Sequence, residues 1–153
     1  MDDPHGIYQE HLDTVSEAVW NHDFDAVAAR MHYPNRLSTI DEVRTVNTPE
    51  VLIAGVRRFR ATLTGLAATG YHRICEEAHF APGRDDMIYG RHRVFILRGG
   101  SYATDPYTGR LTLVRTGEQW LNVAFKLEIE DAKFPVLPPA HMKSNDSQLE
   151  DEH

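Results

Sequence analysis

The hydrophobic pattern of the chain changes its period once, at Gly70. Before this residue, apolar side chains recur every three or four positions, which is typical of amphipathic helices. After it, apolar and polar residues alternate, as they do in strands of an antiparallel sheet with one buried face. The change predicts an α+β fold in which three N-terminal helices pack on a curved antiparallel sheet.

The helical half carries recognisable start and stop signals. A first helix is expected over residues 7–21, and Asp23 can cap a short second helix that ends at Pro34. The third helix is expected to begin after Thr48, a capping residue followed by proline, and to end at Gly70.

Turn residues divide the alternating half into four long strands. The turns are Pro82-Gly83, Gly99-Gly100 and Thr116-Gly117, and short turns between neighbouring strands require antiparallel pairing. The expected strands cover residues 36–38, 43–45, 71–81, 87–97, 102–115 and 119–130, the first two of them short and placed before the third helix.

Length and composition fit one soluble domain. The chain has 153 residues, 41% of them apolar, and a formal charge of −7. We expect a single domain over residues 1–130. Residues 131–153 are polar and interrupted by prolines, so we expect them to form a mobile tail.

Several functional classes are disfavoured by composition. An acidic chain with scattered arginines lacks the basic stripe that nucleic-acid binding requires. The longest apolar run, residues 51–56, is too short to cross a membrane, and the N-terminus does not resemble a signal peptide. A single cysteine, Cys75, points to a reducing compartment, and we expect a cytoplasmic protein.

Strand register predicts a polar cluster inside the sheet. If Ala81 pairs near Met87, Glu76 lies opposite His92 on a face that is otherwise apolar. A two-residue turn at Gly99-Gly100 then brings Tyr107 opposite His92, with Asp105 on the same face, unless a bulge near Pro106 shifts the pairing. The candidate site residues are therefore His92, Glu76, Tyr107 and Asp105.

This cluster is suited to proton transfer. A carboxylate beside an imidazole fixes its tautomer and raises its basicity, and a tyrosine hydroxyl can donate to a developing enolate. Such a set needs no cofactor and no metal. The alternative is a buried hydrogen bond between Glu76 and His92 that only satisfies two polar groups.

Other polar residues have simpler interpretations. The nine histidines never lie within five positions of one another, and His92 with Glu76 is the only plausible nucleus of a metal site. Cys75 is expected on the face opposite to the core. Tyr8 is expected in the core, and His11 at the surface.

The order of elements, together with the stretch Ala18-Val19-Trp20-Asn21-His22-Asp23-Phe24-Asp25-Ala26-Val27 and the closing strand that begins Gly117-Glu118-Gln119-Trp120, resembles the nuclear transport factor 2-like (cystatin-like) superfamily over residues 7–130. The similarity is to the group that includes polyketide cyclases, ketosteroid isomerases and scytalone dehydratase. It implies a cone-shaped sheet with a pocket and a homodimer formed through the outer sheet face, but no particular reaction. The isomerase carboxyl position falls on Leu111, so that chemistry is not carried over.

The outer sheet face has the composition of a dimer interface. It is expected to hold two arginines among aromatic residues, from the set Tyr89, Arg91, Arg93, Phe95, Trp120, Asn122 and Lys126. The leading hypothesis is a dimer whose cone binds a small apolar oxygenated molecule, as a cofactor-free lyase or isomerase if it is catalytic. The alternatives are a non-catalytic accessory protein on the same fold and a small subunit of a ring-hydroxylating dioxygenase.

Overall fold

The computed structural model describes residues 3–138. The elements in chain order are α1 (Pro4–Trp20), α2 (Phe24–Ala29), β1 (Met31–Ser38), β2 (Val43–Val46), α3 (Pro49–Gly65), β3 (Gly70–Phe80), β4 (Met87–Arg98), β5 (Ser101–Tyr102), β6 (Tyr107–Thr116) and β7 (Gln119–Leu127). The helices come first and the long strands follow, as the sequence predicts.

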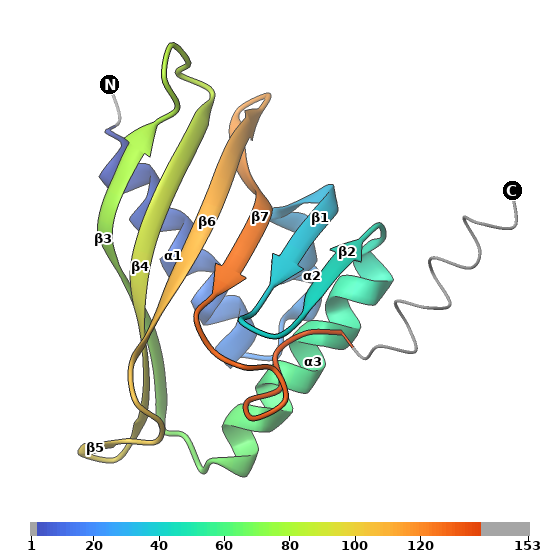
Figure 1. Ribbon diagram of the computed structural model, residues 1–153, viewed down its shortest axis with the longest axis vertical. Coiled ribbons are helices and arrows are strands. Elements are labelled where there is room, and N and C mark those ends of the chain that lie inside the picture. The colour runs from blue at the N-terminus through green and yellow to red at the C-terminus, as the bar shows by residue number, and fades with distance from the viewer. Residues whose placement is uncertain (1–2, 139–153) are drawn as a thin grey trace, which may run out of the picture.

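The strands form one curved sheet in the order β2-β1-β7-β6-β4-β3, with β5 paired to β4 (Figure 1). All neighbours are antiparallel except β1 and β7, which run parallel. Helix α1 packs on the sheet mainly against β3, and α3 crosses beside α2 and β2 (Figure 1). Within residues 3–138, no helix is both long and apolar enough to cross a membrane.

The predicted N-terminal helix caps are present, whereas the third helix ends at Gly65 and not at Gly70, which begins β3. The Asp23 carboxylate accepts a hydrogen bond from the Ala26 amide, and the Thr48 hydroxyl accepts one from the Val51 amide. Pro34 does not end α2; it lies inside β1. It falls between Met31 and Arg36, where the pairing of β1 with β7 is irregular, so its missing N–H breaks no regular ladder.

A bulge at Glu76 divides the pairing of β3 with β4. From Phe80 to Glu77 the register is the predicted one, with Phe80 opposite Ile88. Beyond the bulge it shifts by one residue, so that Cys75, not Glu76, lies opposite His92. Because side chains alternate between faces, this single extra residue reverses the orientation of the rest of β3.

The other two registers also shift. Tyr107 lies opposite Val94 instead of His92, because residues 103–106 form an irregular segment between β5 and β6. In the last hairpin, Leu113 lies opposite Asn122, one residue from the predicted partner. The alternation of β6 is nevertheless as expected, with its odd-numbered residues facing inward.

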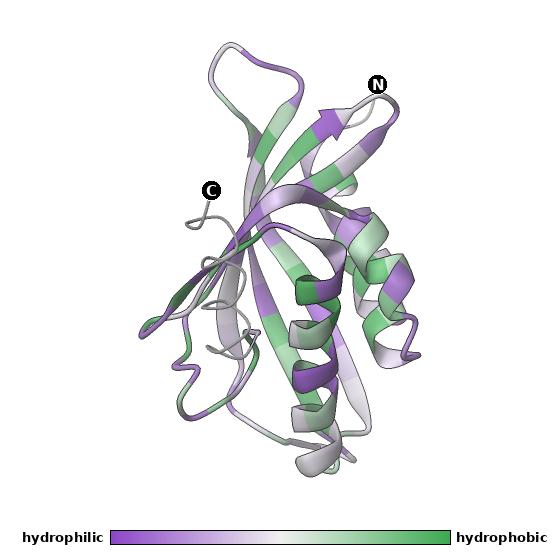
Figure 2. Ribbon diagram, turned by 90° about the vertical axis from the view of Figure 1, so that its right-hand side faces the viewer, coloured by the Kyte–Doolittle hydropathy of each residue, from purple (hydrophilic) through white to green (hydrophobic). Residues whose placement is uncertain are grey.

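The interior contains two groups of buried side chains. The larger one joins α1, α2 and α3 to strands of the sheet, and the smaller one surrounds Tyr8 and Leu12 between α1 and strands β3, β4 and β6. Hydropathy colouring shows the apolar stripe of α3 alternating with polar positions along the helix (Figure 2). The interior therefore has one cluster that includes residues of α3 and a second cluster around Tyr8.

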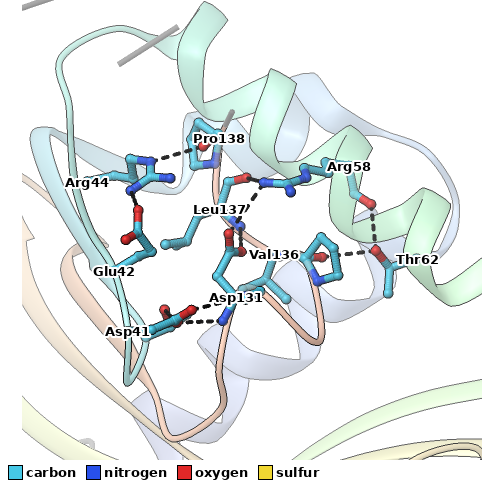
Figure 3. A network of polar contacts seen from close by, with 12 residues as sticks. Asp41, Glu42, Arg44, Arg58, Thr62, Asp131, Val136, Leu137 and Pro138 are labelled. Atoms are coloured by element: carbon cyan, nitrogen blue, oxygen red, sulfur yellow. Dashed lines mark hydrogen bonds and ion pairs between the residues drawn. The ribbon is translucent and has the colours of Figure 1, made fainter. Parts of the chain in front are cut away.

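Residues 131–138 do not behave as the expected mobile tail, because they pack along α3 (Figure 3). Leu137 is fully buried, and one Asp131 carboxylate oxygen accepts hydrogen bonds from the Val136 and Leu137 amides. Arg58 and Thr62 of α3 donate to the carbonyls of Leu137 and Pro135. These bonds satisfy a backbone that the prolines keep out of regular structure. Residues 139–153 lie outside the described part of the chain.

Candidate functional site

The interior between the helices and the sheet contains a cavity of about 70 Å³. All three helices contribute to its wall, together with strands β1, β3, β4, β6 and β7 and the segment 131–138. Most of the wall is apolar, with Val15, Val94 and Leu127 as typical members. Five polar side chains interrupt it: His11, Tyr71, Arg73, Tyr107 and Asn122.

Arg73 is the only arginine or lysine in this wall, and it is 5% exposed. Its Nε donates to the Ser16 hydroxyl at 2.7 Å, and Nη2 donates to the Leu12 carbonyl at 3.3 Å. Within residues 3–138, no carboxylate forms an ion pair with it. A buried cation with neutral partners alone is unfavourable, which makes this side chain the chemically distinctive feature of the cavity.

The two tyrosines of the wall flank this cation. The Arg73 guanidinium lies 5.7 Å from the centre of the Tyr71 ring. Burial raises the pKa of both Tyr71 and Tyr107, and the positive charge of Arg73 acts against this shift. Both phenols are therefore neutral at physiological pH and can donate hydrogen bonds.

His11 lies on α1 and is 1% exposed, so the expectation that it lies at the surface is wrong. Burial is the main reason that its pKa falls to about 3, and the charges of Arg30 and Arg73 add to the effect. Its Nδ1 lies 3.4 Å from the Arg30 guanidinium. The imidazole is consequently neutral in the folded protein.

His92 lies behind the cavity wall in a hydrogen-bonded pair with Tyr8. The Tyr8 hydroxyl is 2.7 Å from His92 Nδ1 and accepts a hydrogen bond from the Leu111 amide. The Tyr8 hydroxyl and His92 Nδ1 share one hydrogen bond, in which the tautomer of His92 decides which of the two groups donates. Burial lowers the pKa of His92 and raises that of Tyr8. His92 Nε2 has no hydrogen-bond partner among the described residues and lies against Gly109.

The structure places two of the four predicted site residues inside the cone, but not in one site: His92 is paired with Tyr8, and Tyr107 belongs to the cavity wall. His92 is fully buried and Tyr107 lines the cavity. Glu76 instead points outward and forms an ion pair with Arg91 at 3.1 Å. Asp105 is exposed in the irregular segment before β6. The bulge at Glu76 and the extra residues before Tyr107 account for both corrections, and Tyr8 takes the place beside His92 that was predicted for Glu76.

The same shifts reveal residues that sequence reasoning missed. Arg73 and Cys75 face inward, whereas Ile74 is 51% exposed. Asn122 is buried in the cavity wall, although it was placed on the outer face. Trp120 also packs against the inner cluster around Tyr8, so neither residue belongs to the predicted outer surface.

A metal centre is not evident in the part of the chain that the structure describes. Residues 3–138 contain no group of three or more histidine, cysteine or acidic side chains arranged to hold an ion. Burial raises the pKa of the Cys75 thiol to about 11, so it is protonated and unreactive at neutral pH.

No known protein family and no curated protein matches the sequence. Several solved structures, however, are similar to this chain in fold. A protein of unknown function with a cystatin-like fold from Nostoc punctiforme has 15% identity and a TM-score of 0.61, over 86% of this chain and 92% of its own. An NTF2-like protein with a cystatin-like fold from Novosphingobium aromaticivorans has 15% identity and a TM-score of 0.60, over 82% of this chain and 80% of its own. The chain has the NTF2-like, cystatin-like fold.

The NTF2-like fold agrees with the family resemblance of the sequence, and it specifies no reaction. A third structure, a proposed aromatic ring hydroxylase from Novosphingobium aromaticivorans, has 13% identity and a TM-score of 0.53, over 80% of this chain and 86% of its own. At such identities the similarity concerns the fold alone. The cavity of this protein is therefore the basis for its function.

Proposed function

We propose that the cone binds a small, largely apolar molecule that carries an anionic oxygen group, a carboxylate or an enolate. The observation that carries this proposal is Arg73, a buried cation in the wall of an apolar cavity with no carboxylate partner among the described residues. A bound anion would supply the missing counter-charge, and a guanidinium can bind a carboxylate through two parallel hydrogen bonds.

The pattern of β3 supports a functional reason for this arginine. The bulge at Glu76 turns Arg73 into the cone and leaves Ile74 half exposed on the other face. Hydrophobic burial alone would favour the opposite arrangement. A site where the fold departs from its stabilising pattern is where binding or catalysis is expected.

The size of the cavity limits the apolar part of the ligand. A protein cavity of about 150 Å³ can hold benzene. At about 70 Å³, this cavity has about half that volume. It is therefore suited to a chain of roughly three or four carbon atoms beyond the acidic group. Butyrate is an appropriate probe of this class.

Isothermal titration with butyrate and with its neutral analogue butyramide tests the proposal. The unmodified protein should bind butyrate, and Arg73→Met should weaken this binding by at least tenfold, because a charge-assisted pair is worth about 1.5–3 kcal/mol. Binding of butyramide should change less than twofold. Arg93→Met is the matched control, since Arg93 contacts Thr108 across the sheet and does not line the cavity.

Two results would contradict the proposal. One is the absence of binding for small carboxylates in general. The other is an Arg73→Met variant that loses no more affinity for butyrate than Arg93→Met does. In either case the counter-charge argument would not describe the site.

Proton transfer is a second candidate, because the His11 imidazole lies in the same wall as Arg73. Burial and the charges of Arg30 and Arg73 lower the pKa of His11 and make it a weak base in the empty site, so this reaction requires that the bound anion raise that pKa. In this reaction a C–H bond beside a carbonyl would break, its proton would pass to His11, and its electron pair would move to the carbonyl oxygen, where Arg73 would stabilise the enolate. Exchange of the C3 protons of 2-oxobutyrate in deuterated water should then be accelerated by the protein and not by His11→Gln. Binding without such acceleration would assign the protein to the non-catalytic class.

A further inference from the structure

A second hollow adjoins the cavity on the outside of the molecule. It is a groove of about 310 Å³ between α1 and the first half of β3. Asp13, Ser16, Glu17 and Trp20 line it from the helix, and residues 69–74 line it from the strand. Strand β3 is at the end of the described sheet, so this groove runs along an edge of the cone (Figure 1).

The groove and the cavity share part of their walls. Tyr71 and Arg73 line both. The Ser16 hydroxyl, which faces the groove, accepts a hydrogen bond from Arg73 Nε at 2.7 Å and is also hydrogen-bonded to the Tyr71 side chain. Ser16, Tyr71 and Arg73 therefore lie between the groove and the cavity on this side, and the Arg73 guanidinium is held there by its hydrogen bond to Ser16.

The side of the cavity next to α3 is more firmly closed. Val136 forms part of the cavity wall, and Phe134 contacts the rings of both Phe59 and Tyr107. The backbone of residues 131–138 is held by Asp131, by Arg58 and Thr62 of α3, and by Arg44, which donates to the Pro138 carbonyl (Figure 3). Opening this side requires displacement of a backbone segment, whereas opening the groove side requires only rotation of side chains.

We propose that the groove between α1 and β3 is the entrance and outer compartment of the cone site, with Ser16, Tyr71 and Arg73 as its gate. A ligand passes the gate with its apolar end first, and its acidic group stops at Arg73. Any part larger than the cavity can hold remains in the groove. The identity of the ligand rests on the proposed function, but the entry route does not.

Thiol labelling measures the route without any ligand. Val94 lines the cavity, is 1% exposed and lies opposite Arg73 in the sheet, so Val94→Cys in a Cys75→Ser background places a single thiol beyond the gate. The probe is methyl methanethiosulfonate, a small neutral thiol reagent. Val27→Cys, at another buried position of the wall, serves if Val94→Cys does not fold.

Glu17→Trp is designed to fill the groove from α1, and Thr14→Trp is its control at an exposed position of the same helix that lines neither hollow. We expect Glu17→Trp to slow labelling at least tenfold relative to Thr14→Trp. Asp131→Ala, which removes the carboxylate that holds residues 136 and 137, should leave the rate within twofold. The free energy of unfolding of each variant identifies labelling that occurs through global unfolding.

Equal labelling rates in Glu17→Trp and Thr14→Trp would overturn the proposal. A rate that responds to Asp131→Ala and not to Glu17→Trp would place the entrance at residues 131–138 and overturn it as well. Because these rates involve no ligand, a negative titration with butyrate leaves them interpretable. Failure of the entry route and failure of the proposed function are thus separate results.

Discussion

At the scale of single residues, the interior of the cone contains three buried basic side chains. Arg73, His11 and His92 are all buried, and the charge of Arg73 contributes to the lowered pKa of both imidazoles. Among the described residues, the cavity wall contains no carboxylate to balance this charge. Under the proposed function, a bound anion supplies this negative charge.

Arg73→Met should stabilise the unliganded protein. The substitution removes a buried charge with neutral partners alone and replaces it with an apolar side chain of similar length. We expect the free energy of unfolding, measured with urea, to rise by about 1–2 kcal/mol. A loss of stability would mean that the hydrogen bonds to Ser16 and Leu12 outweigh the cost of burial. The exposed Arg84→Met serves as the control.

At the scale of elements, the sequence predicted the helices, the hairpins and the faces of β6, because caps, turns and alternation are local properties. It did not predict the bulge at Glu76, since nothing in the alternation of β3 marks an extra residue there. Arg73 was missed for this reason. The inward orientation of His92 and Tyr107 was predicted correctly because β4 is regular and the shift before Tyr107 is an even number of residues.

The contact between Tyr8 of α1 and His92 of β4 depends on a glycine of β6, Gly109. A Cβ atom at Gly109 would lie 2.5 Å from His92 Nε2, so Gly109→Ala must displace the ring that is hydrogen-bonded to Tyr8. We expect a loss of about 2–3 kcal/mol in the free energy of unfolding. Gly100→Ala, at a position with open space around it, should change stability by less than about 0.5 kcal/mol. Equal effects of the two substitutions would contradict the packing described for this pair.

At the scale of the whole molecule, helices and sheet enclose two clusters of buried side chains, and the wall of the cavity is formed mostly by residues of the larger cluster. The segment 131–138 belongs to this wall, although its polar, proline-rich sequence predicted a tail. Leu137 and Val136 provide the burial that such a composition conceals, and Asp131 supplies acceptors for their amides. The packing partner of this segment, α3, is far away in sequence, so local pattern could not identify it.

The buried imidazoles make stability depend on pH. His11 has a pKa of about 3 in the folded protein, below its ordinary value, so between these values the unfolded state binds the extra proton. Stability is complete above about pH 6.5 and falls as the pH decreases. The free energy of unfolding, measured with urea, should decrease between about pH 7.5 and about pH 5. In His11→Gln this decrease should be smaller by about 2 kcal/mol than in the unmodified protein. His79→Gln, at an exposed site, should leave the full loss in place.

The most direct test of the central claim is a crystal structure of the protein grown with butyrate. We predict that the carboxylate lies within hydrogen-bond distance of the Arg73 guanidinium, with the alkyl chain in the cavity beside Val15 and Leu111. An empty cavity at a saturating concentration of butyrate, or a carboxylate bound only at the surface, would contradict the assignment of Arg73 as an anion-binding residue.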